Sequence, residues 1–187
     1  MNQYASEILD FWFKKSQPKQ WFEKNNEYDN SIKEKFLNYH NFAVRGDFES
    51  WKNKPYESLS FIILIDQFSR NIFRDNVKSY KYDYMSLEVS KNGIKSQFLQ
   101  EFNNLNEKFF YILPLIHSED IHDQNQGVKL ANEELKMHSD FSTIIKFFDR
   151  HKEIIEKFNR FPHRNKILNR KSTVEEIAFL KTPFSSF

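Results

Sequence analysis

Arginine is the residue type whose placement most suggests chemistry in this sequence. Of 28 cationic residues, 21 are Lys and only 7 are Arg. Six of the seven Arg residues fall in two short windows, which contain Arg70 and Arg74, then Arg150, Arg160, Arg164 and Arg170. Because a guanidinium can bind a carboxylate or phosphate through two parallel hydrogen bonds, a Lys-rich chain is expected to keep Arg where that geometry matters. The windows predict either bound anions or buried ion pairs, and both alternatives stay open.

Asp66 interrupts a run of apolar residues and is followed by Arg70 at i+4 and Arg74 at i+8. This spacing predicts that the three charged side chains share one face of a helix. Ile62 and Ile63, one turn earlier, are expected on the same side, so Asp66 and Arg70 should be at least half-buried. A buried charge needs a partner. A structural ion pair or a ligand site would satisfy that need.

Three histidines stand where acid–base chemistry could occur. His117 directly follows the apolar run 109–116, and His163 lies in the block Arg160-Phe-Pro-His-Arg-Asn165, where a proline breaks the helix. His151 falls on the apolar stripe of its helix, where either a core histidine or a ligand contact fits. Arg and His near a helix end also fit a C-terminal cap. We take His117 and His163 as candidate general bases.

Ser118 is predicted to cap a helix whose first turn contains Glu119 and Asp120, where acidic side chains favour the helix dipole. Glu119 and His122 also match the Glu-x-x-His spacing of carboxylate-bridged metal sites, but such sites need a second copy on another helix, and the sequence has none. The absence of Cys excludes thiolate metal sites, and the sequence has no Gly-rich phosphate loop. We predict no metal and no cofactor.

The elements that must position these side chains are helices. Three Gly and five Pro in 187 residues are too few for many short strands and tight turns. Apolar residues recur at spacings of three and four, which predicts about eight helices in antiparallel pairs. The expected helices cover residues 6–14, 27–45, 53–72, 79–91, 104–114, 118–137, 139–159 and 173–180. We predict an all-α fold in a single domain over residues 1–187.

Several residue types mark the predicted ends of these helices. Asn53 is the expected N-cap of a helix that is apolar almost all round, with Pro55 near its first position, and such a helix belongs in the middle of a bundle. Gly46 is a suitable residue to end the helix before it. Capping boxes are expected at Asn104 with Glu107, and at Ser172 with Glu175 or Thr173 with Glu176. Pro114 predicts a kink or a stop.

The composition excludes several classes of function. The formal net charge is only +2, and Lys residues are dispersed among acidic ones without a basic stripe, so we do not expect nucleic-acid binding. The longest apolar runs, 61–65 and 109–116, are too short to span a membrane. The N-terminus lacks the pattern of a secretory signal, so we expect a cytoplasmic protein. The oligomeric state stays open.

Five blocks of the sequence resemble a known bacterial family. They are Ile8-Leu-Asp-Phe-Trp-Phe13, Asp66-Gln-Phe-Ser-Arg-Asn71, His117-Ser-Glu-Asp120, Arg160-Phe-Pro-His-Arg-Asn165, and the ending that contains Ser172-Thr and Ser185-Ser-Phe187. Their order and content are similar to the family called domain of unknown function 924, over essentially the whole chain. The resemblance implies an all-α, tetratricopeptide-like array of paired helices. It implies no reaction.

The resemblance also marks polar residues as family hallmarks. These are Asp66, Gln67, Arg70, Asn71, His117, Glu119, Asp120, His163, Arg164 and Asn165, and the family tends to show His at the position of His151 as well. Ser69 departs from the family, which more often has Pro there, so the turn after Phe68 is expected to be more helical in this chain.

Two functions fit these observations. In the first, the hallmark blocks and Arg160 line a pocket for a small anionic or carboxylate-bearing ligand, with His117 or His163 as general base and Arg70 and Arg164 as clamps. In the second, the protein is a helical scaffold for a protein partner, and the polar blocks are buried networks that fix helix packing. The pocket is the favoured hypothesis because three separate blocks combine Arg or His with acids or amides. Whether a reaction is catalysed stays open.

Overall fold

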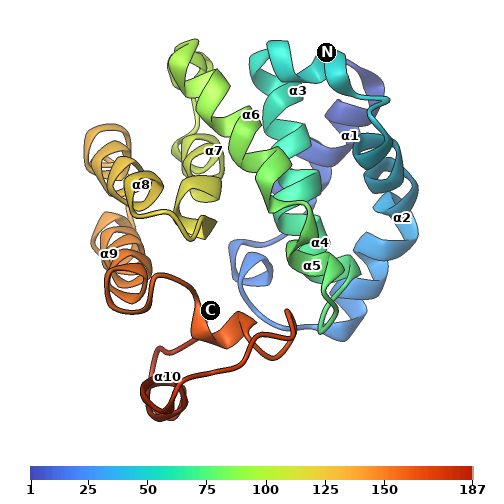
Figure 1. Cartoon of the computed structure of the whole chain (residues 1–187). Helices are drawn as coiled ribbons and strands as arrows, with labels where there is room; N and C mark the ends of the chain where they lie inside the picture. The colour runs from blue at the N-terminus through green and yellow to red at the C-terminus, as the bar shows by residue number, and fades with distance from the viewer. Residues whose placement is uncertain (187) are drawn as a thin grey trace.

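The computed structural model describes residues 1–186, and within that range it contains ten α-helices and no strand (Figure 1). The prediction of an all-α fold is confirmed. The helices are α1 (Gln3–Asp10), α2 (Asn26–Arg45), α3 (Pro55–Ile62), α4 (Phe68–Ile72), α5 (Lys78–Lys81), α6 (Asp83–Lys95), α7 (Leu105–His117), α8 (Ile121–Glu134), α9 (Phe141–Phe158) and α10 (Val174–Phe179). Short 3₁₀ turns at Pro18–Trp21, Glu49–Asn53, Phe98–Glu101 and Pro162–Arg164 lie between them.

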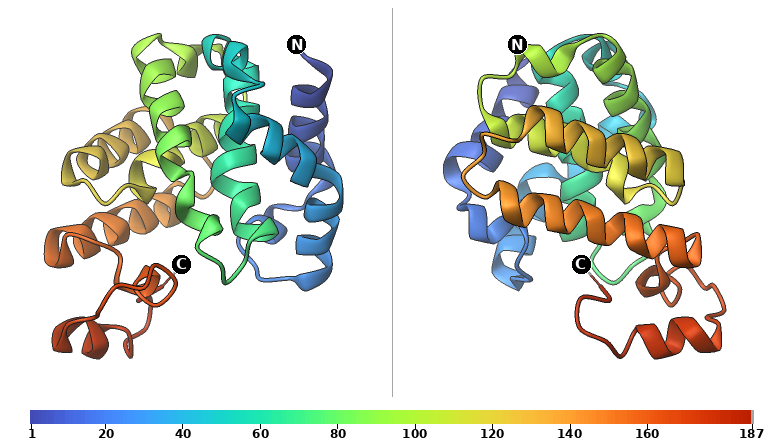
Figure 2. Two further views of the ribbon diagram at one scale, coloured as in Figure 1. Left: turned by 45° about the vertical axis from the view of Figure 1, so that its right-hand side comes forward. Right: turned by 90° about the vertical axis from the view of Figure 1, so that its left-hand side faces the viewer.

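Successive helices pack side by side through the second half of the chain. Helix α6 packs on α7, α7 on α8, and α8 on α9, while α2 packs on α4 and α3 on α6 (Figures 1 and 2). Helix α10 and the segments around it lie beyond α9 at one end of the molecule. This succession of packed neighbours agrees with the array of paired helices that the family resemblance implied.

One rod of helical backbone runs through the centre of the core. It consists of α3, a π-helical turn at Ile63–Gln67, and α4. Every residue from 57 to 69 is buried, as the apolar pattern of this stretch predicted. The π-helical turn contains Asp66 and Gln67, so the wider turn sets the direction of two polar side chains inside the core. Ser69 lies within α4, in agreement with the expected helical turn.

The predicted helix ends are correct in part. Gly46 ends α2 with a left-handed backbone (φ 97°), and both Asn104 with Glu107 and Thr173 with Glu176 form capping boxes. The prediction that Asn53 caps the central helix was wrong, because Asn53 ends a 3₁₀ turn and Lys54 precedes Pro55 as the first flanking residue. Among residues 1–186, no helix is long and apolar enough to cross a membrane.

A stop at Pro114 and a cap at Ser118 do not occur. Pro114 was expected to cause a kink or a stop, and α7 continues through it to His117. Ser118 is not the N-cap of α8: its extended backbone ends α7, and the side chain of Asp120 accepts the capping hydrogen bond from the backbone N–H of His122. The two helices therefore need a longer link than the sequence pattern suggested, and His117 becomes the last residue of α7.

Candidate functional site

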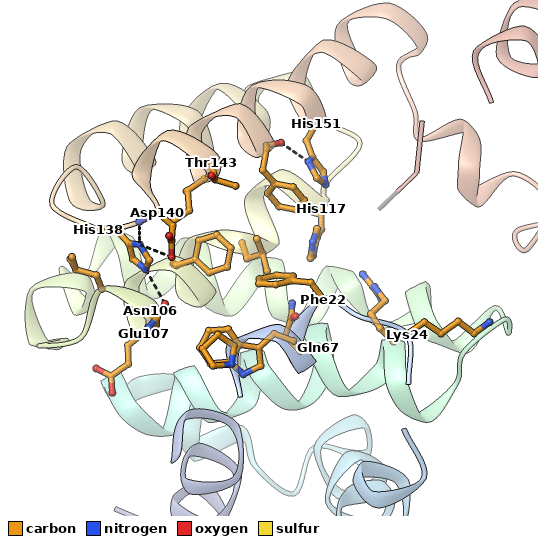
Figure 3. Close-up of a pocket in the computed structure, with 18 of the residues that line it drawn as sticks. Phe22, Lys24, Gln67, Asn106, Glu107, His117, His138, Asp140, Thr143 and His151 are labelled. Atoms are coloured by element: carbon orange, nitrogen blue, oxygen red, sulfur yellow. Dashed lines mark hydrogen bonds and ion pairs between the residues drawn. The ribbon is translucent and has the colours of Figure 1, made fainter. Parts of the chain in front are cut away.

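A cavity of about 1310 Å³ lies between the central rod, α7 and α9 (Figure 3). Its walls come from stretches that are distant in the sequence, namely residues 18–24, 67–80, 103–117, 138–151 and 163–167, with Tyr56. Rigid helices hold most of these stretches in place. The cavity is large enough for a ligand of drug size, because typical ligand pockets measure roughly 300 to 1,000 Å³.

Half of the predicted site residues line this cavity. They are Gln67, Arg70, His117, His151, His163 and Arg164. The other half do not line it: Asp66, Asn71, Glu119, Asp120, Arg160 and Asn165. The structure therefore separates the set into residues that could contact a ligand and residues that could act only through a neighbour or through folding.

The fully buried carboxylate of Asp66 holds the imidazole of His117. Oδ1 of Asp66 lies 2.9 Å from Nδ1 of His117, and Oδ2 accepts a hydrogen bond of 2.6 Å from the side-chain amide of Gln67. Burial alone would raise the pKa of Asp66. The pKa nevertheless lies below its ordinary value, because the charges of His117 and Arg70 and the hydrogen bond from Gln67 stabilise the carboxylate. An ionised Asp66 keeps a proton on Nδ1 of His117.

This arrangement leaves the other nitrogen of His117 available to the cavity. Nε2 of His117 has no hydrogen-bond partner among residues 1–186, and the side chain lines the cavity. With Nδ1–H directed at Asp66, Nε2 carries the lone pair. A buried carboxylate behind an imidazole is the arrangement that orients histidine as a general base.

Arg70 is committed to an ion pair that the sequence pattern did not reveal. Its two terminal nitrogens donate to the two carboxylate oxygens of Asp83 at 2.9 and 2.8 Å, while Asp66, the partner predicted from the i+4 spacing, lies 3.9 Å away. Burial alone would lower the pKa of Arg70, but the carboxylates of Asp83 and Asp66 together raise it above its ordinary value. The expected i+4 ion pair between Asp66 and Arg70 is therefore present as the longer of the two contacts, and Arg74 pairs with Asp29 at 2.5 Å.

Arg164 is the cation whose charge the surrounding side chains compensate least. Its Nη1 donates to the backbone carbonyl of His117 at 3.0 Å and lies 3.7 Å from Asp83, whose oxygens already accept from Arg70. The buried Nε has no hydrogen-bond partner among residues 1–186. Burial lowers the pKa of Arg164, an effect that Asp83 offsets only in part. The guanidinium is held by ring faces instead, 4.7 Å from the centroid of Tyr80 and 4.5 Å from that of Phe161.

Two further histidines line the same part of the cavity as neutral side chains. Nδ1 of His151 donates to the backbone carbonyl of Phe147 at 2.8 Å, and burial lowers the pKa of His151 well below its ordinary value. Burial and the adjacent guanidinium of Arg164 lower the pKa of His163 to about 3. A histidine whose pKa is about 3 is a weak general base, so these surroundings do not favour His163 in that role, and the candidate role of His117 rests on its contact with Asp66.

The predicted residues outside the cavity form a separate network near the C-terminus. Arg170 donates to both oxygens of Glu119 at 2.6 and 2.9 Å, and its Nε donates to Asn165 at 2.9 Å. Asn165 also donates to Glu176 at 3.2 Å, and Arg160 donates to both oxygens of Glu176 at 2.6 and 2.8 Å. These contacts join the turn after α9 to the starts of α8 and α10.

Comparison with known proteins assigns the chain to the same family that its sequence blocks resemble. A family model described as "Bacterial protein of unknown function (DUF924)" matches residues 8–184. The chain belongs to this family. A solved structure of a protein of unknown function from Agrobacterium tumefaciens is similar, with 33% identity, a TM-score of 0.86, and coverage of 95% of this chain and 96% of that one. No curated protein matches the chain.

The polar residues that the family resemblance marked as hallmarks lie in two different surroundings in this chain. Gln67, Arg70, His117, His163 and Arg164 line the cavity, whereas Glu119 and Asn165 belong to the C-terminal network. Two more serve locally: Asn71 donates to Asp29 at 2.8 Å, and Asp120 caps α8. Within residues 1–186, no group of three or more acidic or His side chains is placed to hold a metal ion.

The sequence pattern did not indicate several residues that shape the site. Asp83, the partner of Arg70, begins α6, and Tyr80 lies between the guanidinium groups of Arg70 and Arg164, with its ring centroid 4.5 and 4.7 Å from the two Cζ atoms. Trp21 and Phe22 form part of the cavity wall. These contacts join residues 10 to 84 positions apart in sequence, which no local spacing reveals, so only the cluster of aromatic residues around position 21 offered a signal.

Proposed function

We propose that this DUF924 protein binds a small carboxylate-bearing molecule in the cavity, with the anionic group at Arg164 and His117. The observation that carries the proposal is the buried guanidinium of Arg164, which has one hydrogen bond to a carbonyl and no carboxylate of its own. Burying a charge that its neighbours compensate only in part is unfavourable, and a bound anion would offset that cost. A phosphate group has the same kind of oxygens, so it is the alternative anion to test.

His117 would then act on the bound molecule as a general base. Asp66 orients its ring through Nδ1, which leaves the lone pair of Nε2 for a proton of the ligand or of a water molecule. The hydrogen bond from Arg164 to the carbonyl of His117 keeps the cation beside the base. Together these groups would suit removal of a proton close to a carboxylate, since the cation stabilises the negative charge that develops.

Thermal unfolding with propionate, octanoate or inorganic phosphate tests the binding part of the proposal. A probe at 100 times its dissociation constant should stabilise the parent protein by about 2.7 kcal/mol. Arg164→Lys keeps the charge but removes the fork, so it should weaken binding by about 1 to 3 kcal/mol. Arg150→Lys is the matched control, because Arg150 lies outside the cavity and pairs with Glu153 on the surface. The proposal is wrong if no probe stabilises the parent protein.

The base is tested through a proton transfer from carbon. An imidazole can remove a proton next to a ketone but not one next to a simple carboxylate, so deuterium exchange at the carbon next to the ketone of 2-oxooctanoate, followed by NMR, should be faster with the parent protein than with His117→Gln. His163→Gln should retain most of the effect, because a histidine with a pKa of about 3 is a weak base. Equal rates with and without His117 would refute its role as the base.

The alternative function, a helical scaffold for a protein partner, is supported by the C-terminal network. Half of the predicted polar residues lie outside the cavity, and several of them join segments of the chain in ion pairs. If those residues and Arg164 alike serve only packing, Arg164→Lys should cost stability, and none of the anions should raise the unfolding temperature. The thermal experiment above therefore separates the two functions.

A further inference from the structure

The cavity is elongated, and its two ends differ in chemistry (Figure 3). Figure 3 shows His117 and His151 toward one end, with Lys24 beyond them. Glu107, Asn106, His138 and Asp140 lie together at the other end, and Phe22 and Gln67 lie between the two groups. A molecule that filled the cavity would therefore meet a cation and a base at one end and different groups at the other.

The far end carries acidic side chains without a Lys or Arg partner in residues 1–186. Glu107 is half-buried, and its nearest polar contact is the backbone N–H of Asn104 at 3.4 Å. Asp140 lies 4.0 Å from Nδ1 of His138, and that nitrogen accepts a hydrogen bond of 3.0 Å from the backbone N–H of Asp140. The other ring nitrogen of His138, Nε2, donates to the side-chain oxygen of Asn106 at 3.0 Å, so both ring nitrogens have partners within the protein. Burial raises the pKa of Glu107, as expected for a carboxylate that lacks a cation.

The stretch between the two ends is mainly apolar. Figure 3 shows Phe22 between the two groups, and Trp21, Phe109, Leu113 and Phe147 are further apolar residues of the cavity wall. Phe22 is 61% exposed even though its ring lies 6.2 Å from that of Phe109 and 6.4 Å from that of Phe110. An aromatic ring that lines a cavity and faces solvent gains free energy when an apolar ligand covers it. The volume of about 1310 Å³ far exceeds the size of a simple anion such as acetate or phosphate.

We propose that the ligand is an extended molecule with a carboxylate at one end and an amine at the other. The carboxylate would lie at Arg164 and His117, the apolar body along Trp21 and Phe22, and the amine at Glu107. The proposal rests on the proposed function for its carboxylate end. It adds that the ligand has a second, cationic end and a body long enough to join the two. The basis for this ligand class is the distribution of the lining groups: Arg164, whose one carboxylate neighbour Asp83 lies 3.7 Å away and is shared with Arg70, and Glu107, which has no Lys or Arg partner in residues 1–186, with the apolar Phe22 between the two ends.

Three probes that share one chain length separate the contributions of the ends. Octanoate has the carboxylate and the body, octylamine has the body and the amine, and 8-aminooctanoate has all three. Isothermal titration calorimetry at pH 7 should give a dissociation constant for 8-aminooctanoate about 1.5 to 5 times lower than for octanoate, the worth of one partly exposed ion pair. Octylamine should bind more weakly than 8-aminooctanoate because it lacks the group that meets Arg164.

Two variants assign those differences to residues. Glu107→Gln keeps the helix cap, since Gln can accept the same hydrogen bond from Asn104, and it should remove the preference for 8-aminooctanoate while leaving octanoate binding unchanged. Arg164→Lys should weaken both carboxylates. Glu133→Gln is the matched control, because this acid lies outside the cavity and pairs with Lys129 on α8.

The outcomes distinguish this inference from the proposed function. If octanoate binds through Arg164 but the amine adds nothing, or Glu107→Gln leaves the preference intact, the inference is wrong and the proposed function stands. If octylamine binds as well as 8-aminooctanoate and Arg164→Lys changes neither, both are wrong. Loss of binding for all three probes would also overturn both.

Discussion

Replacing Arg164 by Met should leave the protein about as stable as its parent, whereas the same replacement at Arg70 should destabilise it strongly. Both side chains are largely buried guanidinium groups that stack on Tyr80. They differ in their partners, because Arg70 has the bidentate pair with Asp83 and Arg164 has one carbonyl. Met fills a similar volume without a charge, so the two variants compare a paired cation with an uncompensated one.

The expected magnitudes follow from these contacts. Arg70→Met breaks two charged hydrogen bonds and leaves Asp83 with only Arg164, 3.7 Å away, which should cost about 3 to 5 kcal/mol. Arg164→Met loses one charged hydrogen bond, worth about 1.5 to 3 kcal/mol, and stacking worth about 0.5 to 2 kcal/mol. It also removes a buried charge whose desolvation costs several kcal/mol. These opposing terms should place Arg164→Met within about 2 kcal/mol of the parent.

Urea unfolding at pH 7 without added anions measures both differences directly. For a chain of this length, the loss at Arg70 corresponds to a fall in Tm of about 6 to 20 °C, which thermal unfolding can verify. Octanoate should raise the Tm of the parent and should not raise that of Arg164→Met. If Arg164→Met loses as much stability as Arg70→Met, Arg164 is a structural strut, and the reasoning from its missing partner is refuted.

Two further predictions concern the buried histidines and the C-terminal network. The pKa of His163 is lowered to about 3 and that of His151 well below its ordinary value, so both lie beneath the unfolded value of about 6.5. The stability contributed by each neutral histidine is therefore fully present above pH 6.5 and is lost as the pH falls. Each histidine should lower the free energy of unfolding by up to about 2 kcal/mol between pH 7 and 5. His151→Leu should flatten this loss in urea unfolding at the two pH values, and an unchanged slope would contradict the assignment. Glu119→Gln leaves Arg170 without its carboxylate, so it should cost about 1 to 3 kcal/mol in urea unfolding without changing octanoate affinity, whereas a large affinity loss would place Glu119 in the site.

The helical class of the fold could be predicted because local residue patterns determine it. Spacings of three and four among apolar residues identified the long helices α2 and α9, and the Asn104 and Thr173 capping boxes lie where the sequence placed them. The ends that the sequence misplaced depend on backbone geometry that side-chain pattern does not encode. The three residues between α7 and α8 place the cap at Asp120, two positions after the predicted Ser118.

The candidate site was less predictable because its decisive contacts join distant parts of the chain. Local spacing suggested Asp66 as the partner of Arg70, but the start of α6 brings Asp83 closer. Arg70 and Arg164 look equivalent in sequence, and only the three-dimensional contacts show that one is fully paired. The choice of Arg over Lys marked both kinds of position without distinguishing a cavity residue from a member of a structural network.

The nuclear magnetic resonance signal of the Arg164 side chain tests most directly whether an anion binds beside His117. In the protein without ligand, the buried Nε–H of Arg164 has no acceptor among residues 1–186, and Arg164→Lys identifies its signal by removing it. Addition of octanoate should shift the ¹⁵N and ¹H frequencies of this group and the ¹⁵N frequency of His117 Nε2 along one saturable curve, whereas octanol should not. Signals of Arg164 and His117 that stay unchanged at concentrations of octanoate that saturate the protein would contradict the proposed carboxylate site.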